Sequence, residues 1–130
     1  ELSQRIGSKP YYCTPEHHDQ AVAWISHLPV MVSAELIHAN LQETDSEVIN
    51  LAQELASSGF RDTSRVGGGN PELGVMMARY NREALLRSLS QYHQGLAELM
   101  GYIEREEWEQ LEQVLKATKQ ERNKFVHYQE

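Results

Sequence analysis

Cysteine is almost absent from this 130-residue chain, which has Cys13 and no other. A lone thiol excludes an intrachain disulfide and a zinc site built from several cysteines. It is compatible with a reducing, cytoplasmic setting. Positive charge is also scarce: 12 Lys and Arg stand against 19 Asp and Glu, for a formal net charge of −7. Because nucleic-acid-binding proteins usually present a basic face, we expect no nucleic-acid partner.

A long hydrophobic run is missing as well. The longest apolar stretch, Ala21–Ala34, is shorter than the roughly 20 residues that cross a bilayer. Its middle is interrupted by Ser26, His27 and Pro29. No signal peptide is visible, and the chain does not begin with Met. We therefore expect a piece of a longer cytoplasmic protein with no membrane partner.

No stretch of convincing length alternates polar and apolar residues as a half-buried strand does. Instead, Thr14 and Pro15 are suited to the cap and first turn of a helix. Apolar residues then recur at helical spacing: Val22, Ile25, Leu28, Val32 and Leu36. Pro29 lies inside this pattern and should kink the helix, because it removes one backbone donor and crowds the preceding turn. We predict an all-α domain over residues 14–130, preceded by a linker at 1–13.

The rest of the chain continues the helical pattern. SEVINLAQELASS predicts a helix capped by Asp45 or Ser46 and ended by Gly59. GFRDTSRVGGGNP, with its consecutive glycines, predicts a loop, after which Asn70 caps and Pro71 opens the next helix. Apolar residues then recur in steps of three and four: Leu85, Leu89, Tyr92, Leu96, Leu99 and Ile103. Such a seam favours near-parallel helix packing and a homodimer, with an intrachain bundle as the alternative.

Neither a metal site nor a dinucleotide site is predicted within this chain. By composition the following residues resemble a ligand set: His17, His18, Asp19, His27 and His38. No two of these histidines have the i, i+4 spacing of a helical zinc pair. VGGGNP is neither a dinucleotide nor a P-loop fingerprint, and no strand precedes it.

Two segments carry more specific chemistry. In GFRDTSR, an arginine beside a carboxylate can bind a substrate carboxylate through two hydrogen bonds. A surface ion-pair cluster of Arg61, Asp62 and Arg65 would explain the same residues. In the first helix, His27 is either a satisfied core histidine or part of a polar notch. Pro29 favours the notch, because the carbonyl that a proline leaves unpaired collects polar side chains beside a cavity or ligand.

Taken in order, these segments resemble the C-terminal helical domain of the prephenate/arogenate dehydrogenase family. The matching features are His18-Asp19, AVAWISHLP, GFRDTSR, GGGNPEL and Asn81. The resemblance extends from about Lys9 to the end of the chain, and it is the combination that is specific. The variants AVAWISHLPVMVS and GFRDTSRVGGGNPEL look most like the arogenate-preferring bacterial enzymes.

The resemblance implies half of an enzyme. Family members couple a nicotinamide-binding Rossmann domain to an all-α dimerisation domain that resembles the C-terminal domain of 6-phosphogluconate dehydrogenase. As homodimers they oxidise arogenate to tyrosine, or prephenate to 4-hydroxyphenylpyruvate, with NAD or NADP and with loss of CO₂. The family's catalytic histidine lies in the Rossmann domain, which this chain lacks. The resemblance therefore implies no catalytic residue here and no activity for this chain alone.

The resemblance also implies roles for particular residues. Arg65 matches the arginine that binds a substrate carboxylate, and Asp62 matches the acid that orders this region near the subunit boundary. The remaining matches surround the substrate cleft: Ser26, His27, His18 and Asp19. On this interpretation the kinked helix and the glycine bend that carries Arg65 together form one wall of the substrate pocket.

Two departures from the family pattern bear on the substrate. Val30 follows SHLP where many prephenate-using members have a second histidine linked to feedback by tyrosine. The absence of that histidine here favours arogenate as the substrate. Gly74 stands where some members carry a tryptophan. Arogenate has an ammonium group, for which Glu35 and Asp62 are the candidate carboxylates, and the sequence places neither of them. The alternatives are a purely structural dimerisation module without a substrate role and, less favoured, a sensor that binds tyrosine.

Overall fold

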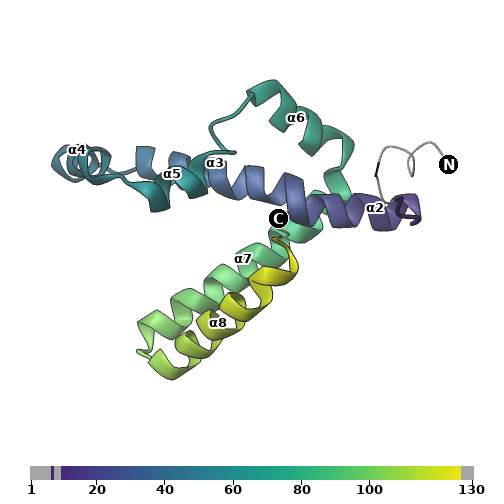
Figure 1. Cartoon of the computed structure of the whole chain (residues 1–130). Coiled ribbons are helices and arrows are strands. Elements are labelled where there is room, and N and C mark those ends of the chain that lie inside the picture. The colour runs from purple at the N-terminus through teal and green to yellow at the C-terminus, as the bar shows by residue number, and fades with distance from the viewer. Residues whose placement is uncertain (1–6, 8–9, 127–130) are drawn as a thin grey trace. The chain divides into compact units, whose positions relative to one another are not determined.

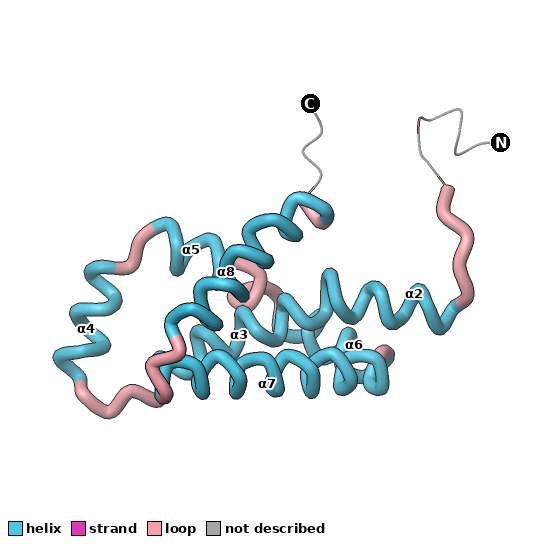
Figure 2. The backbone as a smooth tube through the Cα atoms, turned by 90° about the horizontal axis from the view of Figure 1, so that it is seen from below, coloured by secondary structure: helices cyan, strands magenta, loops and turns pink. Residues whose placement is uncertain are grey.

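The computed structural model describes residue 7 and residues 10–126, and within these ranges every regular element is a helix (Figures 1 and 2). The elements are α2 (Pro15–Val22), η1 (Ala23–His27), α3 (Leu28–Leu41), α4 (Ser46–Leu55), α5 (Ser58–Ser64), α6 (Pro71–Tyr80), α7 (Arg82–Glu104), α8 (Trp108–Glu121) and η2 (Arg122–Lys124). The predicted all-α class is confirmed. Most of the predicted linker at 1–13 lies outside the described residues.

The chain divides into two compact units, one ending at Leu89 and one beginning at Ser90. The first unit contains α2 to α6 and the start of α7. It holds every residue for which the sequence predicts a role in a site. The second unit contains the rest of α7 together with α8 and η2.

Side-chain caps fix the starts of three helices where the sequence predicts them. Thr14 Oγ1 accepts a hydrogen bond from the His17 N–H at 3.2 Å, and Pro15 follows in the first turn. Asp45 caps α4 and Asn70 caps α6, each with a 2.9 Å hydrogen bond from the backbone N–H two residues later. Each cap satisfies one of the N–H groups that the first turn of a helix leaves unpaired.

The effect of Pro29 appears in the turn that precedes it. Residues Ala23–His27 form a π-helical turn, in which the Leu28 N–H donates to the Ala23 carbonyl. Proline has no N–H for the carbonyl four residues earlier, and its ring crowds that carbonyl, so the preceding turn widens. The helix nevertheless continues, and Figure 1 shows α2, η1 and α3 as one run.

That continuous run, Pro15–Leu41, has 27 residues. The argument from length against a membrane span is therefore wrong, since the whole run is longer than its apolar centre. By length and composition the run could cross a bilayer, although core helices of soluble proteins pass the same test. The absence of a membrane partner remains an expectation.

The predicted loop at GFRDTSR is wrong, because this segment forms helix α5. Helix α4 ends at Leu55, before the predicted stop at Gly59, since Ala56 turns to an extended backbone with ψ 125°. Inside α5, the Thr63 hydroxyl donates to the Gly59 carbonyl at 2.8 Å. The irregular segment is confined to the glycine turn between α5 and α6.

Few side chains are buried in the first unit. The buried apolar residues are Ala23, Leu28 and Leu85, and the buried polar residues are Ser33 and Ser88. Many large apolar side chains remain at least 40% exposed, including those of Trp24, Ile25, Leu51, Leu55, Leu73 and Val75. Exposed apolar surface on this scale marks an interaction surface.

In the second unit, apolar side chains of α7 and α8 line a common hollow, Leu99 from one helix and Val114 from the other. The turn between the helices is held by Arg105, whose Nε and Nη2 donate to the Glu107 carboxylate at 2.8 and 3.0 Å. This hydrogen bond from Arg105 lowers the pKa of Glu107.

Candidate functional site

Two groups of side chains in the first unit collect the residues of interest. The first surrounds Asn81, which lies between α6 and α7. Its Nδ2 atom donates to the Asp19 backbone carbonyl at 2.8 Å and lies 3.2 Å from His27 Nδ1. We call Asp19, His27 and Asn81 the asparagine cluster. It joins the start of α7 to the π-helical turn.

The asparagine cluster places some of the predicted site residues together. His27 is half-buried and contacts Asn81, and Ser26 is half-buried beside it in sequence. The exposed His18 pairs with the side chain of Asp19, with 3.1 Å between Nδ1 and Oδ1. A polar hollow of about 300 Å³ between α2 and α7 is lined by Asp19 and Asn81, among others. The predicted polar notch thus has polar neighbours.

The second group is centred on Ser33, which is buried in α3 with 3% of its surface exposed. Its hydroxyl donates to the Thr63 carbonyl and accepts from the Gly67 N–H, both at 2.8 Å. We call Ser33, Thr63 and Gly67 the serine clasp. It fixes the backbone two residues before and two residues after Arg65.

Gly67 allows the clasp to close. A Cβ atom at this position would lie 2.2 Å from the Ala34 nitrogen and 2.3 Å from the Ser33 carbonyl carbon. These are backbone atoms of α3, which cannot rotate away. The sequence predicts a loop at these glycines, and at Gly67 the structure shows a close approach of this loop to α3.

Arg65 is the C-cap of α5, and its side chain is exposed. Asp62 pairs with Arg61 instead, with 3.3 Å between Oδ1 and Nε, and both side chains are more than 70% exposed. An ion pair this exposed contributes little stability. Within the described residues, the Arg65 guanidinium has no carboxylate partner.

The first helix and the glycine turn do line a common hollow of about 370 Å³. Its walls include Val30, Met31 and Ala34 from α3, Gly67 from the turn and Gly74 from α6. Both positions at which the chain departs from the family pattern therefore face one space. His27 and Arg65 do not line this hollow. Ser33 of the serine clasp lies six positions beyond His27, which is about 9 Å along a helix.

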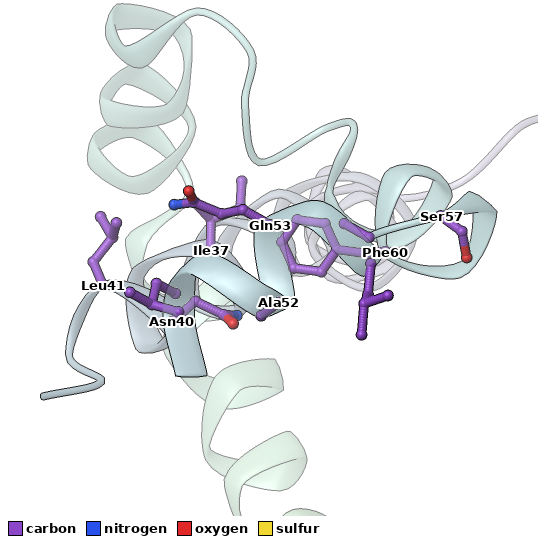
Figure 3. Close-up of a pocket in the computed structure, with 10 residues that line it drawn as sticks. Ile37, Asn40, Leu41, Ala52, Gln53, Ser57 and Phe60 are labelled. Atoms are coloured by element: carbon purple, nitrogen blue, oxygen red, sulfur yellow. The ribbon is translucent and has the colours of Figure 1, made fainter. Parts of the chain in front are cut away.

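A larger hollow of about 520 Å³ lies among α3, α4 and α5 (Figure 3). Its lining is mostly apolar and includes Ile37, Leu41, Ala52 and Phe60. None of the predicted site residues lines it. In the ranges that the structure describes, no group of three or more His, Cys, Asp or Glu side chains could hold a metal ion.

Sequence reasoning missed the roles of Ser33 and Gly67 and gave Asn81 none. Ser33 is a small polar residue within an apolar helix, which is a weak signal. Its two partners lie 30 and 34 residues away, so nothing local predicts them. Asn81 stood out only as part of the family resemblance.

An all-α unit with this much exposed apolar surface is typical of a helical domain that pairs with another protein surface. A family model described as prephenate dehydrogenase, dimerization domain, matches residues 14–117. The chain therefore belongs to the prephenate dehydrogenase dimerisation-domain family, and the resemblance found in the sequence is confirmed.

Individual relatives agree with this assignment. The chain is 30% identical over 111 residues to a prephenate dehydrogenase of Bacillus subtilis, covering 85% of this chain and 29% of that protein. It is 28% identical over 96 residues to a cyclohexadienyl dehydrogenase of Zymomonas mobilis, covering 74% of this chain and 32% of that protein. The chain thus spans about a third of the curated relatives that it matches.

Solved structures confirm the fold. The crystal structure of Synechocystis arogenate dehydrogenase matches with a TM-score of 0.93 and 59% identity, over 95% of this chain and 44% of that one. The prephenate dehydrogenase from A. aeolicus, in complex with hydroxyphenyl propionate and NAD⁺, matches with a TM-score of 0.83 and 26% identity. That match covers 96% of this chain and 44% of the other.

Proposed function

We propose that this chain is the dimerisation and substrate-binding domain of an arogenate dehydrogenase, which converts arogenate to tyrosine and CO₂ and transfers a hydride to NAD⁺ or NADP⁺. The observation that carries the proposal is the 59% identity to the Synechocystis enzyme over 95% of the chain. Both the family match and the relatives belong to the same dehydrogenase class.

The first role of the domain is to form a homodimer. The family is named for dimerisation, and large apolar side chains along α4 and α6 are exposed, such as Leu51, Leu55, Leu73 and Val75. Leaving them in water would cost about 25 cal/mol for each Å² of apolar surface. A second copy of the chain removes that cost.

The second role is to form one wall of the substrate cleft. Arg65 supplies a guanidinium for a substrate carboxylate, and the serine clasp supports this role by holding the backbone on both sides of it. Fixing the backbone around Arg65 before the substrate arrives reduces the entropy lost on binding. Asp62, which the resemblance matches to an acid that orders this region, pairs with Arg61 on the exposed face of α5, an interaction that adds little to the role of Arg65.

The asparagine cluster contributes the polar part of the cleft. His27 and Ser26 lie on the π-helical turn, and His18 and Asp19 lie one to two turns earlier. The proposed preference for arogenate rests on the hollow that Val30 and Gly74 line. A carboxylate for the arogenate ammonium is not assigned, because both candidates already have a local partner: Glu35 pairs with His38 at 3.3 Å and Asp62 pairs with Arg61.

The chemical step belongs to the rest of the protein. As the resemblance implies, a Rossmann domain would hold the nicotinamide that accepts the hydride, together with the family's catalytic histidine. This chain binds and orients the substrate, and alone it should give no turnover. We further propose a cytoplasmic location, and neither a metal ion nor a nucleic acid as partner.

The test is a steady-state assay of the whole protein with arogenate and with prephenate, each with NAD⁺ and NADP⁺. We expect kcat/KM to be at least ~10-fold higher for arogenate than for prephenate, a difference of about 1.4 kcal/mol in transition-state binding. Tyrosine and CO₂ should form in equal amounts, and sedimentation should give a dimer. A dimer that turns over neither substrate would instead support the purely structural module.

A further inference from the structure

We propose that Asn81 is a positioning residue that holds neutral His27 in the tautomer with its proton on Nε2. The ring then offers the substrate an N–H donor and cannot offer it an acceptor. The inference rests on the proposed function for the identity of the ligand, a carboxylated ring that bears oxygen acceptors. The position of the proton on the His27 ring is inferred from the structure alone.

The first step is the orientation of the Asn81 amide. Its Nδ2 atom lies 2.8 Å from the backbone carbonyl of Asp19. A carbonyl oxygen only accepts hydrogen bonds, so the amide atom that faces it must be the nitrogen. An amide turned the other way would place two oxygens against each other. Chemistry therefore fixes this orientation.

The second step transfers that orientation to the histidine. The same Nδ2 atom lies 3.2 Å from His27 Nδ1. An amide nitrogen donates two hydrogen bonds and accepts no hydrogen bond, so Nδ1 must present its lone pair. Neutral imidazole has one N–H, and with Nδ1 as acceptor that proton is on Nε2.

The third step is the rigidity of Asn81 itself. Its backbone N–H donates to the Met77 carbonyl at 3.1 Å, and its own carbonyl accepts from the Leu85 N–H at 3.0 Å. Leu85 is one of the few buried apolar residues, with 3% of its surface exposed. The amide is therefore anchored at the break between α6 and α7.

The fourth step is the location of His27 at the end of the π-helical turn. Turns of this kind occur frequently at functional sites, since they displace one side chain from the regular helical register. Because Nδ1 is occupied on the protein side, Nε2–H is the group left for a ligand. A carboxylate or hydroxyl oxygen of the substrate is a suitable acceptor for it.

The proton position can be measured directly. In the whole protein, selectively ¹⁵N-labelled at histidine, two-bond ¹H–¹⁵N correlation spectra distinguish the two tautomers at a pH where histidine is neutral. The His27 signals are assigned by their absence in His27→Gln. We expect a protonated Nε2 and an unprotonated Nδ1. A wild-type spectrum with the proton on Nδ1 would overturn the inference.

Two variants test whether Asn81 is the cause. Asn81→Asp puts an acceptor opposite Nδ1 and should move the proton to it. Asn81→Ala removes the contact and should give a mixture of tautomers, with a circular dichroism spectrum like that of the wild type. Asn81→Ala is included because the carboxylate of Asn81→Asp would also face the Asp19 carbonyl, and that variant could misfold. An Asn81→Ala spectrum identical to that of the wild type would refute the role of Asn81.

Kinetics then connect the tautomer to binding. Asn81→Asp, which favours the other tautomer, should raise KM for arogenate by about 5- to 10-fold with little change in kcat, because only a small fraction of the rings then keeps the Nε2–H donor. Asn81→Ala should raise KM by no more than about 2-fold, because a mixture keeps at least about half of the rings in the donor tautomer. His27→Gln keeps an N–H donor near the Nε2 position and should retain most of the affinity, whereas His27→Ala should not. In the His27→Gln background, Asn81→Asp should add less than about 2-fold, since no tautomer remains to be fixed.

The two levels of the argument fail separately. If the spectra show the expected tautomer while His27→Ala leaves KM unchanged, the proposed place of His27 at the substrate is wrong. If KM rises in His27→Ala but the spectra show the other tautomer, the assignment of the proton is wrong.

Discussion

Replacing Gly67 by Ala should break the contact that holds the Arg65 turn against α3. The added Cβ would lie 2.2 Å from the Ala34 nitrogen and 2.3 Å from the Ser33 carbonyl carbon. Real Cβ atoms do not approach backbone atoms so closely, so the turn must move away. The hydrogen bond from the Gly67 N–H to the Ser33 hydroxyl, 2.8 Å long, is then lost.

The magnitude follows from what the movement disrupts. Each hydrogen bond of the serine clasp contributes about 1 kcal/mol, and a buried hydroxyl left without a partner costs about 1–3 kcal/mol. If the turn carries Thr63 away as well, Ser33 loses its second partner. We therefore expect Gly67→Ala to lower the free energy of unfolding by about 2–4 kcal/mol.

The measurement is urea unfolding of the whole protein at one fixed concentration, because unfolding of a dimer depends on concentration. The matched control is Gly68→Ala, whose Cβ would have its nearest neighbour at 3.9 Å. That variant should be as stable as the wild type or more stable by up to about 1 kcal/mol. If both variants unfold alike, the close approach at Gly67 does not hold the turn.

Three further predictions address the clasp, the hollow and the second unit. Ser33→Ala should lower the free energy of unfolding in urea by about 1–3 kcal/mol and raise KM for arogenate, since the Thr63 carbonyl and the Gly67 N–H lose their partner. A loss of stability with an unchanged KM would contradict the link between the serine clasp and Arg65. Val30→His should reduce the preference for arogenate over prephenate by at least about 5-fold and introduce inhibition by tyrosine, both measured by steady-state kinetics; an unchanged ratio would contradict the role of the hollow. Arg105→Ala should raise the pKa of Glu107, which the Arg105 hydrogen bond lowers. The pair stabilises the fold at a pH above the ordinary carboxyl range, and this stabilisation is lost as the pH falls through the lowered pKa of Glu107. An NMR titration in which Arg105→Ala leaves the Glu107 pKa unchanged would contradict the pairing.

Local chemistry made the helix starts predictable. Thr14, Asp45 and Asn70 accept hydrogen bonds from N–H groups two or three residues away, so each cap is contained within a few letters of sequence. The family resemblance depended on short motifs in a fixed order and was equally accessible.

Contacts between distant segments were not predictable in this way. The sequence predicts a loop at α5 because three consecutive glycines lie in the same segment, whereas the packing of α5 against α3 decides the outcome. The serine clasp joins positions 30 and 34 residues apart. Asn81 contacts a histidine 54 residues away, and no periodicity in the sequence indicates such a pair.

The central claim is that the turn carrying Arg65 binds a substrate carboxylate. The most direct test compares Arg65→Ala with Arg61→Ala in the whole protein, because Arg61 is an exposed neighbour already paired with Asp62. We predict that Arg65→Ala raises KM for arogenate by ~10- to 100-fold, the worth of charge-assisted hydrogen bonds, while Arg61→Ala changes it less than about 2-fold and both remain dimers. Equal KM values for the two variants would contradict the account and leave a domain that only dimerises.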